Sequence, residues 1–128
     1  MLGTLYNDIV VDSERIGDYV MNIVEARLGK HLLRYNGLCL NLDKKIATID
    51  GNPVSLTPTE SALLHLLLAN CGKVLSRQQL MDTVWAGVIV TDRTVDVNIT
   101  RLRKKLGTYA QYIVSRTGFG YVFECTGV

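Results

Sequence analysis

The chain has 128 residues, of which 48% are hydrophobic and 20% charged, and a formal net charge of +2. This size and composition predict one globular domain with a short appendage and exclude an intrinsically disordered chain. No run approaches the roughly 18 consecutive apolar residues of a membrane span, and the first residues lack a signal-peptide pattern, so we expect a cytoplasmic protein without membrane contact.

Charge is unevenly distributed along the chain. Residues 1–72 hold six basic and eight acidic side chains, whereas residues 73–128 hold eight basic and four acidic ones. A positive second half favours a one-sided contact with a polyanion such as nucleic acid.

Cysteine and histidine usage argues against a metal or cofactor site. Cys39, Cys71 and Cys125 are far apart and odd in number, and only two histidines accompany them. We therefore interpret the cysteines as buried thiols, with no zinc site and no disulfide framework. No nucleophile–base pair, phosphate-binding glycine loop or carboxylate cluster is recognisable, so we predict that the chain is not an enzyme.

Residues 1–30 are predicted to form an appendage. A short apolar run of strand character at 6–11 precedes Ser13, which can cap a helix reaching about Leu28. The apolar residues of that helix recur at helical spacing, so it has one face to bury. The appendage either packs on the rest of the chain, pairs with another copy, or is the end of a larger unit.

Short strands separated by turns follow. The apolar segments lie at 32–35, 38–42, 46–49 and 53–56. The breaks between them contain Asn36-Gly37, Asp43-Lys44 and Asp50-Gly51, and Asn-Gly and Asp-Gly supply the positive φ of tight hairpins. This pattern predicts an antiparallel sheet of three or four strands.

Two capping boxes then introduce two helices. Thr57 at the N-cap, Pro58 at N1 and Glu60 at N3 predict a helix that ends near residues 70–72. Ser76 and Gln79 repeat the device and predict a second helix, followed by a short apolar loop at 86–90.

A third helix is predicted at 92–106. Val95, Ile99, Leu102 and Leu106 recur at helical spacing and form one apolar face. The opposite face carries Arg93, Val97, Thr100, Arg101 and Lys104, and the flanks carry Asn98, Arg103 and Lys105. Such a helix packs one side in a core and presents a basic, hydrogen-bonding side outward.

The last element is a β-hairpin at 113–123 whose tip contains Gly118 and Gly120. The order of strands, three helices and hairpin predicts an α+β fold: a small antiparallel sheet followed by a winged helix-turn-helix, with an extra N-terminal helix.

These segments together resemble the DNA-binding domain of OmpR/PhoB-type response regulators, which are bacterial transcription regulators of two-component phosphorelay systems. The resemblance rests on LTPTE at 56–60, GKVLSRQQL at 72–80, VW at 84–85, DRTVDVNITRLRKKL at 92–106 and GFGY at 118–121. It implies that residues 31–128 form the winged-helix domain, that 92–106 is a recognition helix in the major groove, and that 113–123 is a wing near the minor groove.

The resemblance and the exposed helix face together predict the DNA contacts. On the helix these are Val97 toward a thymine methyl, Asn98 and Thr100 toward base edges or phosphates, Arg101 toward guanine, and Arg93, Arg103 and Lys104 toward phosphates. Asn98 and Thr100 stand where other members often carry larger, basic residues, so the family's base preferences are not transferred.

For four further candidate DNA contacts, two interpretations remain open. Trp85 directs its indole N–H to a phosphate or packs in the core, and Arg77 meets the backbone near a helix N-terminus or is solvated. Tyr121 offers its hydroxyl to a phosphate or packs under the wing. Many relatives carry arginine directly before the first glycine of the tip, where this chain has Thr117. Either Arg116 reaches DNA through a bulge, or Thr117 makes a weaker contact.

Partners are implied by the same resemblance. Double-stranded DNA is the expected ligand, and the loop of Ala86, Gly87, Val88, Ile89 and Val90 is expected to face RNA polymerase. A homodimer arranged in tandem on DNA is also implied. A receiver domain and its histidine kinase are implied as partners only if a longer protein exists upstream. The alternative is a winged-helix protein–protein interaction or dimerisation module without specific DNA binding.

Overall fold

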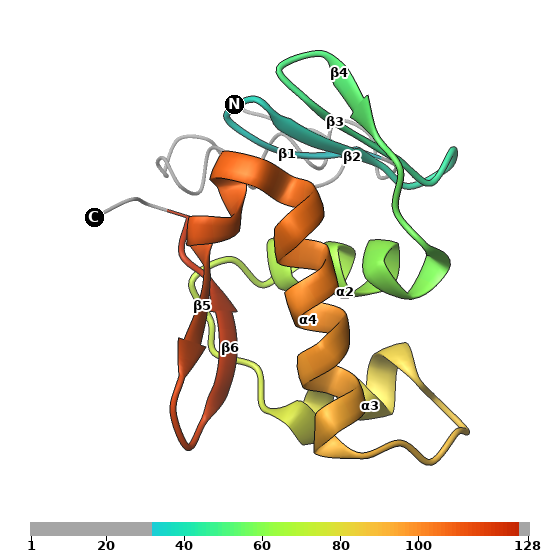
Figure 1. Ribbon diagram of the computed structural model, residues 1–128, viewed down its shortest axis with the longest axis vertical. Coiled ribbons are helices and arrows are strands. Elements are labelled where there is room, and N and C mark those ends of the chain that lie inside the picture. Colours follow the sequence, from blue (N-terminus) through green and yellow to red (C-terminus); the bar gives the residue numbers. More distant parts are fainter. Residues whose placement is uncertain (1–31, 126–128) are drawn as a thin grey trace, which may run out of the picture. The chain divides into compact units, whose positions relative to one another are not determined.

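The computed structural model describes residues 32–125, which form the coloured part of the ribbon (Figure 1). The strand and helix predicted within residues 1–30, and the domain boundary there, lie outside this range. The described residues belong to two units: one comprises residues 32–55 and Cys125, and the other spans Leu56–Glu124. No helix of the described part is long and apolar enough to cross a membrane.

The first unit contains the predicted antiparallel sheet, which has four strands in chain order. They are β1 (Leu32–Tyr35), β2 (Leu38–Asn41), β3 (Ile46–Ile49) and β4 (Asn52–Val54). Asn36 has φ 52°, and Asp50 and Gly51 have φ 51° and 86°, the left-handed conformations that their hairpins require. In β2 the buried Leu38 and Leu40 alternate with partly exposed neighbours, as in a strand with one buried face.

The second unit contains the three predicted helices, α2 (Pro58–Ala69), α3 (Arg77–Val84) and α4 (Asp92–Leu106). Both capping boxes are formed, at Thr57 with Glu60 and at Ser76 with Gln79. Each box satisfies two N–H groups that would otherwise lack an intrahelical partner. Thr91 caps α4, and Gly107 at φ 59° ends it.

The apolar stripe of α4 forms the centre of this unit. Val95, Ile99, Leu102 and Leu106 are fully buried, as predicted, and α4 packs on both α2 and α3. Leu63, Leu64, Leu67, Leu80 and Phe123 are buried with them in the same unit. The opposite side of α4 is thereby turned outward.

The predicted wing is the hairpin of β5 (Ile113–Arg116) and β6 (Gly120–Phe123). Leu75, in the linker between α2 and α3, exchanges two backbone hydrogen bonds of 2.8 and 2.9 Å with Tyr121 on the outer edge of β6. A Cβ atom at Gly120 would lie 2.0 Å from the Leu75 carbonyl oxygen, so only glycine fits there. The 3-10 helix η2 (Gly107–Tyr112) before the wing was not anticipated from the sequence.

The cysteines differ from the prediction. Cys71 and Cys125 are disulfide-bonded, and Cys39 is a partly exposed free thiol. The interpretation of all three as buried thiols is therefore wrong. Sequence spacing does not report which cysteines the fold brings close, so the pattern alone could not reveal the bonding.

A buried carboxylate joins α2 to α4. Glu60 is 2% exposed, and its Oε1 lies 2.6 Å from Lys105 Nζ and accepts a 2.9 Å hydrogen bond from Thr57 N–H. Burial acts to raise the pKa of Glu60, but the bonds from Lys105 and Thr57 outweigh it and hold the pKa below its ordinary value. Lys105, which was predicted on a flank of the helix, thus has a structural partner.

Replacing Lys105 by alanine should lower the free energy of unfolding by about 1–2 kcal/mol at neutral pH, because the Glu60 carboxylate stays buried without a counter-charge. The folded pKa of Glu60 lies below its unfolded value of about 4.3, so this stabilisation is present above that pH and is lost as the pH falls through the folded value. Urea titrations should therefore show the parent and the variant converging in acid.

Lys104→Ala is the matched control, because Lys104 is an exposed neighbour on the same helix. It should leave the free energy of unfolding unchanged within about 0.5 kcal/mol. Equal losses in the two variants would contradict a specific role for the Glu60–Lys105 pair.

Candidate nucleic-acid interface

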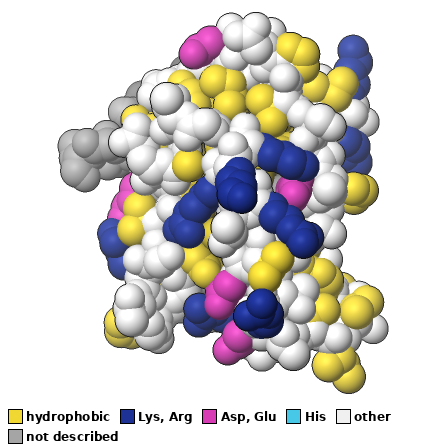
Figure 2. Space-filling view, in the orientation of Figure 1, with side chains coloured by type: hydrophobic (Ala, Val, Ile, Leu, Met, Phe, Trp, Pro, Cys, Tyr) yellow, Lys and Arg dark blue, Asp and Glu magenta, His cyan; other side chains and the backbone are white. Residues whose placement is uncertain are grey.

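The outward face of α4 carries several basic side chains. Arg93, Val97, Thr100, Arg101 and Lys104, all predicted contacts, line one shallow hollow of about 480 Å³ together with Asp96. Lys and Arg side chains gather over this helix, with acidic side chains among them (Figure 2). The structure therefore brings together the residues that the helical periodicity placed on one side.

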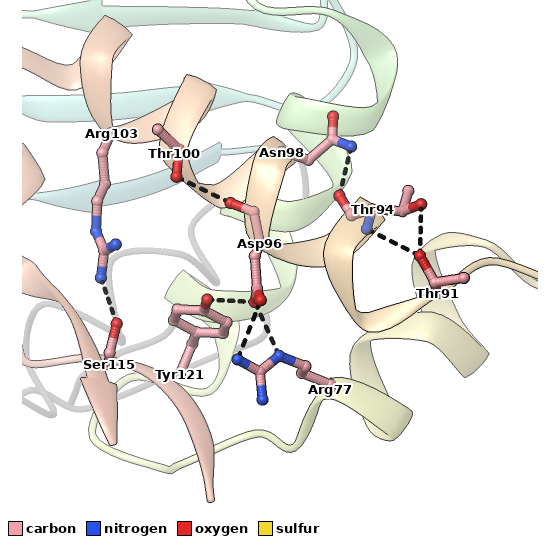
Figure 3. Close-up of polar contacts among 9 residues, drawn as sticks. All are labelled: Arg77, Thr91, Thr94, Asp96, Asn98, Thr100, Arg103, Ser115 and Tyr121. Atoms are coloured by element: carbon pink, nitrogen blue, oxygen red, sulfur yellow. Dashed lines mark hydrogen bonds and ion pairs between the residues drawn. The ribbon is translucent and has the colours of Figure 1, made fainter. Parts of the chain in front are cut away.

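Two polar side chains on α4 are oriented by bonds to their own helix. Asn98 Nδ2 donates to the Thr94 carbonyl at 2.9 Å, and Thr100 Oγ1 donates to the Asp96 carbonyl at 3.0 Å (Figure 3). In this rotamer the Thr100 hydroxyl uses its proton on the helix and presents acceptor lone pairs outward. It can therefore accept a hydrogen bond from an amino group on a base edge.

Asp96 connects three elements at the edge of the α4 face. Arg77 Nε and Nη2, from the first turn of α3, lie 2.8 and 3.2 Å from its two carboxylate oxygens. The hydroxyl of Tyr121, on β6, donates to Asp96 Oδ1 at 2.5 Å (Figure 3). The Arg77 guanidinium also lies 5.7 Å from the centre of the Tyr121 ring, within the range of a cation–π contact. We call these three residues the Asp96 cluster.

Protonation in the Asp96 cluster follows from these contacts. The hydrogen bond from Arg77 lowers the pKa of Asp96, with a further contribution from Tyr121, and the same bond raises the pKa of Arg77. Burial, reinforced by the charge of Asp96, raises the pKa of Tyr121. At neutral pH the cluster therefore holds a carboxylate, a guanidinium and a neutral phenol that donates its proton.

The Asp96 cluster bears on two predicted contacts. Tyr121 is 6% exposed, so its ring packs under the wing while its hydroxyl faces Asp96. Arg77 is partly exposed, but its guanidinium already forms an ion pair with the Asp96 carboxylate. Asp96 itself was not singled out from the sequence. The available signal was that it is the one acidic residue in the stretch 93–106.

Arg103 lies at the junction between α4 and the wing. Its Nε and Nη2 donate to the Ile113 carbonyl at 3.0 and 2.7 Å, and Nη2 also donates to Ser115 Oγ at 3.1 Å (Figure 3). Its guanidinium lies 5.6 Å from the centre of the Tyr121 ring. Arg103 thus attaches β5 to the helix, and its contact with a phosphate stays a prediction.

Trp85 is the C-cap residue of α3 and is partly exposed. Together with Gln78, Met81 and Asp82 and the loop of residues 86–90 it lines a hollow of about 400 Å³. Two apolar side chains of that loop project into solvent, since Ile89 is 99% and Val88 61% exposed. The predicted apolar loop is therefore an accessible surface next to the basic helix.

The strands of the wing pair residue for residue, with Ser115 opposite Tyr121 and Arg116 opposite Gly120, so this described hairpin has no bulge. Ser115 and Tyr121 point toward α4, and the alternation of side chains places Arg116 on the other face. Arg116 forms an ion pair with Glu124 there. Thr117 is exposed at the tip beside Phe119, which is 74% exposed.

Comparison with known sequences identifies related proteins. Residues 51–123 match the family model described as "Transcriptional regulatory protein, C terminal". The phosphate regulon transcriptional regulatory protein PhoB of Pseudomonas aeruginosa is 42% identical over 94 residues, which are 72% of this chain and 41% of that protein. The chain thus spans less than half the length of such relatives.

Solved structures agree in fold. The response regulator DrrB of Thermotoga maritima, an OmpR/PhoB homologue, superposes with a TM-score of 0.68 at 27% identity over 84% of this chain and 52% of that one. The DNA-binding domain of RstA from Klebsiella pneumoniae, solved in complex with the RstA box, gives a TM-score of 0.65 at 28% identity over 73% of this chain and 96% of that one. The sheet, three helices and C-terminal hairpin are thus those of an OmpR/PhoB winged-helix domain, as predicted.

Replacing Tyr121 by phenylalanine should separate the two functions considered for its hydroxyl. Loss of the bond to Asp96 is expected to lower the free energy of unfolding by about 1–2 kcal/mol, measured by urea denaturation, while DNA affinity changes little. The ring stays in place, so Tyr121→Ala should cost clearly more, about 3–5 kcal/mol. A Phe variant of unchanged stability that bound DNA more weakly would instead assign the hydroxyl to a phosphate.

Proposed function

Since the chain belongs to the family of transcriptional regulatory protein C-terminal domains, we propose that residues 31–128 bind a specific double-stranded DNA sequence and thereby regulate transcription. The observation that supports this most directly is the outward face of α4, where five predicted contacts line one surface. The RstA domain, a neighbour in fold, was solved in complex with its DNA box, and DNA is carried over from it as part of this proposal.

In the proposed complex α4 lies in the major groove. Arg93 and Lys104 contact phosphates, which position the protein, and Arg101 directs its planar donor fork to guanine O6 and N7. Val97 contacts a thymine methyl group, and Thr100 accepts a hydrogen bond from a base amino group. The Asp96 cluster lies beside these residues, and its hydrogen bonds connect α4 to α3 and to the wing.

Replacing Arg101 and Lys104 together by alanine should weaken binding to a DNA site selected from a random pool by at least tenfold at moderate salt. Each phosphate contact contributes about 0.9 to the slope of log affinity against log salt, so the slope should also become shallower. Fluorescence anisotropy at several salt concentrations measures both quantities.

A matched control removes two positive charges elsewhere. Lys44 and Lys45 are exposed in the turn after β2, and the Lys44→Ala, Lys45→Ala double variant should leave the affinity within about twofold if only the α4 face contacts DNA. Affinity retained in the Arg101, Lys104 double variant would contradict the proposed interface. A salt-independent complex with a protein and no DNA binding would favour an interaction module instead.

The loop of residues 86–90 is proposed to contact RNA polymerase. Its support in the described residues is the exposure of Ile89 and Val88 and the adjoining hollow formed with Trp85 and Met81. Binding residues are frequently carried on loops that a rigid scaffold positions.

Changing both Val88 and Ile89 to serine should reduce transcription from a target promoter at least fivefold in a purified system, while affinity for the promoter stays within twofold, because the loop lies outside the α4 face. Runoff transcription and anisotropy on the same DNA give the two readouts. Parallel losses of transcription and DNA affinity would contradict a polymerase role for the loop.

The remaining partners concern the whole protein. The chain spans 41% of the PhoB relative, so these partners are proposals. We propose a tandem homodimer on DNA and, only if a longer protein exists upstream, a receiver domain with its histidine kinase. Action in the cytoplasm belongs to the same proposal.

A further inference from the structure

The wing carries few charged side chains. Residues 113–124 contain one basic side chain, Arg116, and one acidic side chain, Glu124. The tip itself, at 117–119, carries no charge. Any attraction of the wing to phosphates therefore depends on the state of Arg116.

The hairpin register fixes where the Arg116 guanidinium lies. Arg116 is opposite Gly120 and Val114 is opposite Val122, while Glu124 N–H donates to the Tyr112 carbonyl at 2.7 Å. Arg116 and Glu124 thus share one face of the hairpin but lie at opposite ends of it. To reach Glu124, the Arg116 side chain must extend back along this face, away from the tip.

The pair is accessible to solvent. The side chains of Arg116 and Glu124 are 46% and 35% exposed. Exposed ion pairs are weak, so a DNA phosphate can compete with the Glu124 carboxylate for the same guanidinium. Occupation of Arg116 by Glu124 is therefore expected to change DNA affinity by a moderate factor and not to abolish binding.

We propose that Glu124 is an affinity-limiting residue of the DNA interface, which acts by holding the only arginine of the wing away from the phosphate backbone. This rests on the proposed function, since it presupposes that the wing approaches DNA. The partner in competition is the phosphate oxygen, so the effect is expected on all sequences and not on one base pair.

Glu124→Gln removes the charge and keeps the size and the backbone bond. It should raise affinity for the selected site by about 3–10-fold and steepen the slope of log affinity against log salt by about 0.9, the contribution of one new phosphate contact. Arg116→Ala in the parent should change affinity by less than about twofold. Arg116→Ala in the Glu124→Gln background should abolish the gain and restore the parental slope.

Asp82→Asn is the matched control for total charge, because it removes one exposed acidic group on α3 while an amide oxygen can still accept the bond from Gln78. It should leave both affinity and slope close to the parental values. Circular dichroism melts should confirm that all variants are folded.

Two outcomes would overturn the inference while the proposed function stands. One is a Glu124→Gln variant with parental affinity and slope. The other is a gain that persists after Arg116→Ala, which would mean that Glu124 acts by general repulsion and not through Arg116. A parent chain that selects no DNA from a random pool would refute the proposed function, and with it this inference.

Discussion

Burial of the apolar stripe of α4 is the constraint on which the rest of the second unit depends. Four side chains, Val95, Ile99, Leu102 and Leu106, are fully buried. Burial of such a side chain contributes about 1.5–3 kcal/mol, whereas a polar surface contact contributes about 1 kcal/mol or less. The stripe therefore determines the rotation of α4 about its own axis, and the basic face is outward as a consequence. The capped α2 and α3 supply the surface that receives it.

The Asp96 cluster positions the neighbouring elements around α4. One carboxylate binds Arg77 of α3 and Tyr121 of β6, so helix, helix and wing share an anchor. The cost is an anion at the edge of a basic surface, and Arg77 neutralises it. Arg103 performs a related task on β5. Several cations near α4 therefore support its geometry, and Arg93, Arg101 and Lys104 remain for the outward face.

The parts of this structure that were predicted correctly are those encoded by neighbouring residues. Capping boxes, Asn-Gly and Asp-Gly turns and the spacing of apolar residues act within a few positions, so the chain displays them directly. The Asp96 cluster and the Lys105–Glu60 pair join residues that are distant in sequence, and no local pattern reports them. Arg116 was recognised as displaced by one position, but the ion pair with Glu124 depends on the hairpin register. Local sequence patterns thus predicted which side chains lie on the outward face of α4. Tertiary contacts determine which charged side chains already form ion pairs within the protein.

The attachments of the wing have a consequence for assembly. A hairpin normally presents two outer edges whose backbone groups can pair with a strand from another molecule. Here the outer edge of β6 pairs with Leu75, and on β5 the outward Ile113 carbonyl is occupied by the guanidinium of Arg103. The outer edge of β6 is thus covered within the molecule itself, and the outer edge of β5 is occupied at Ile113. The β6 edge is consequently protected against edge-to-edge pairing with a strand from another molecule.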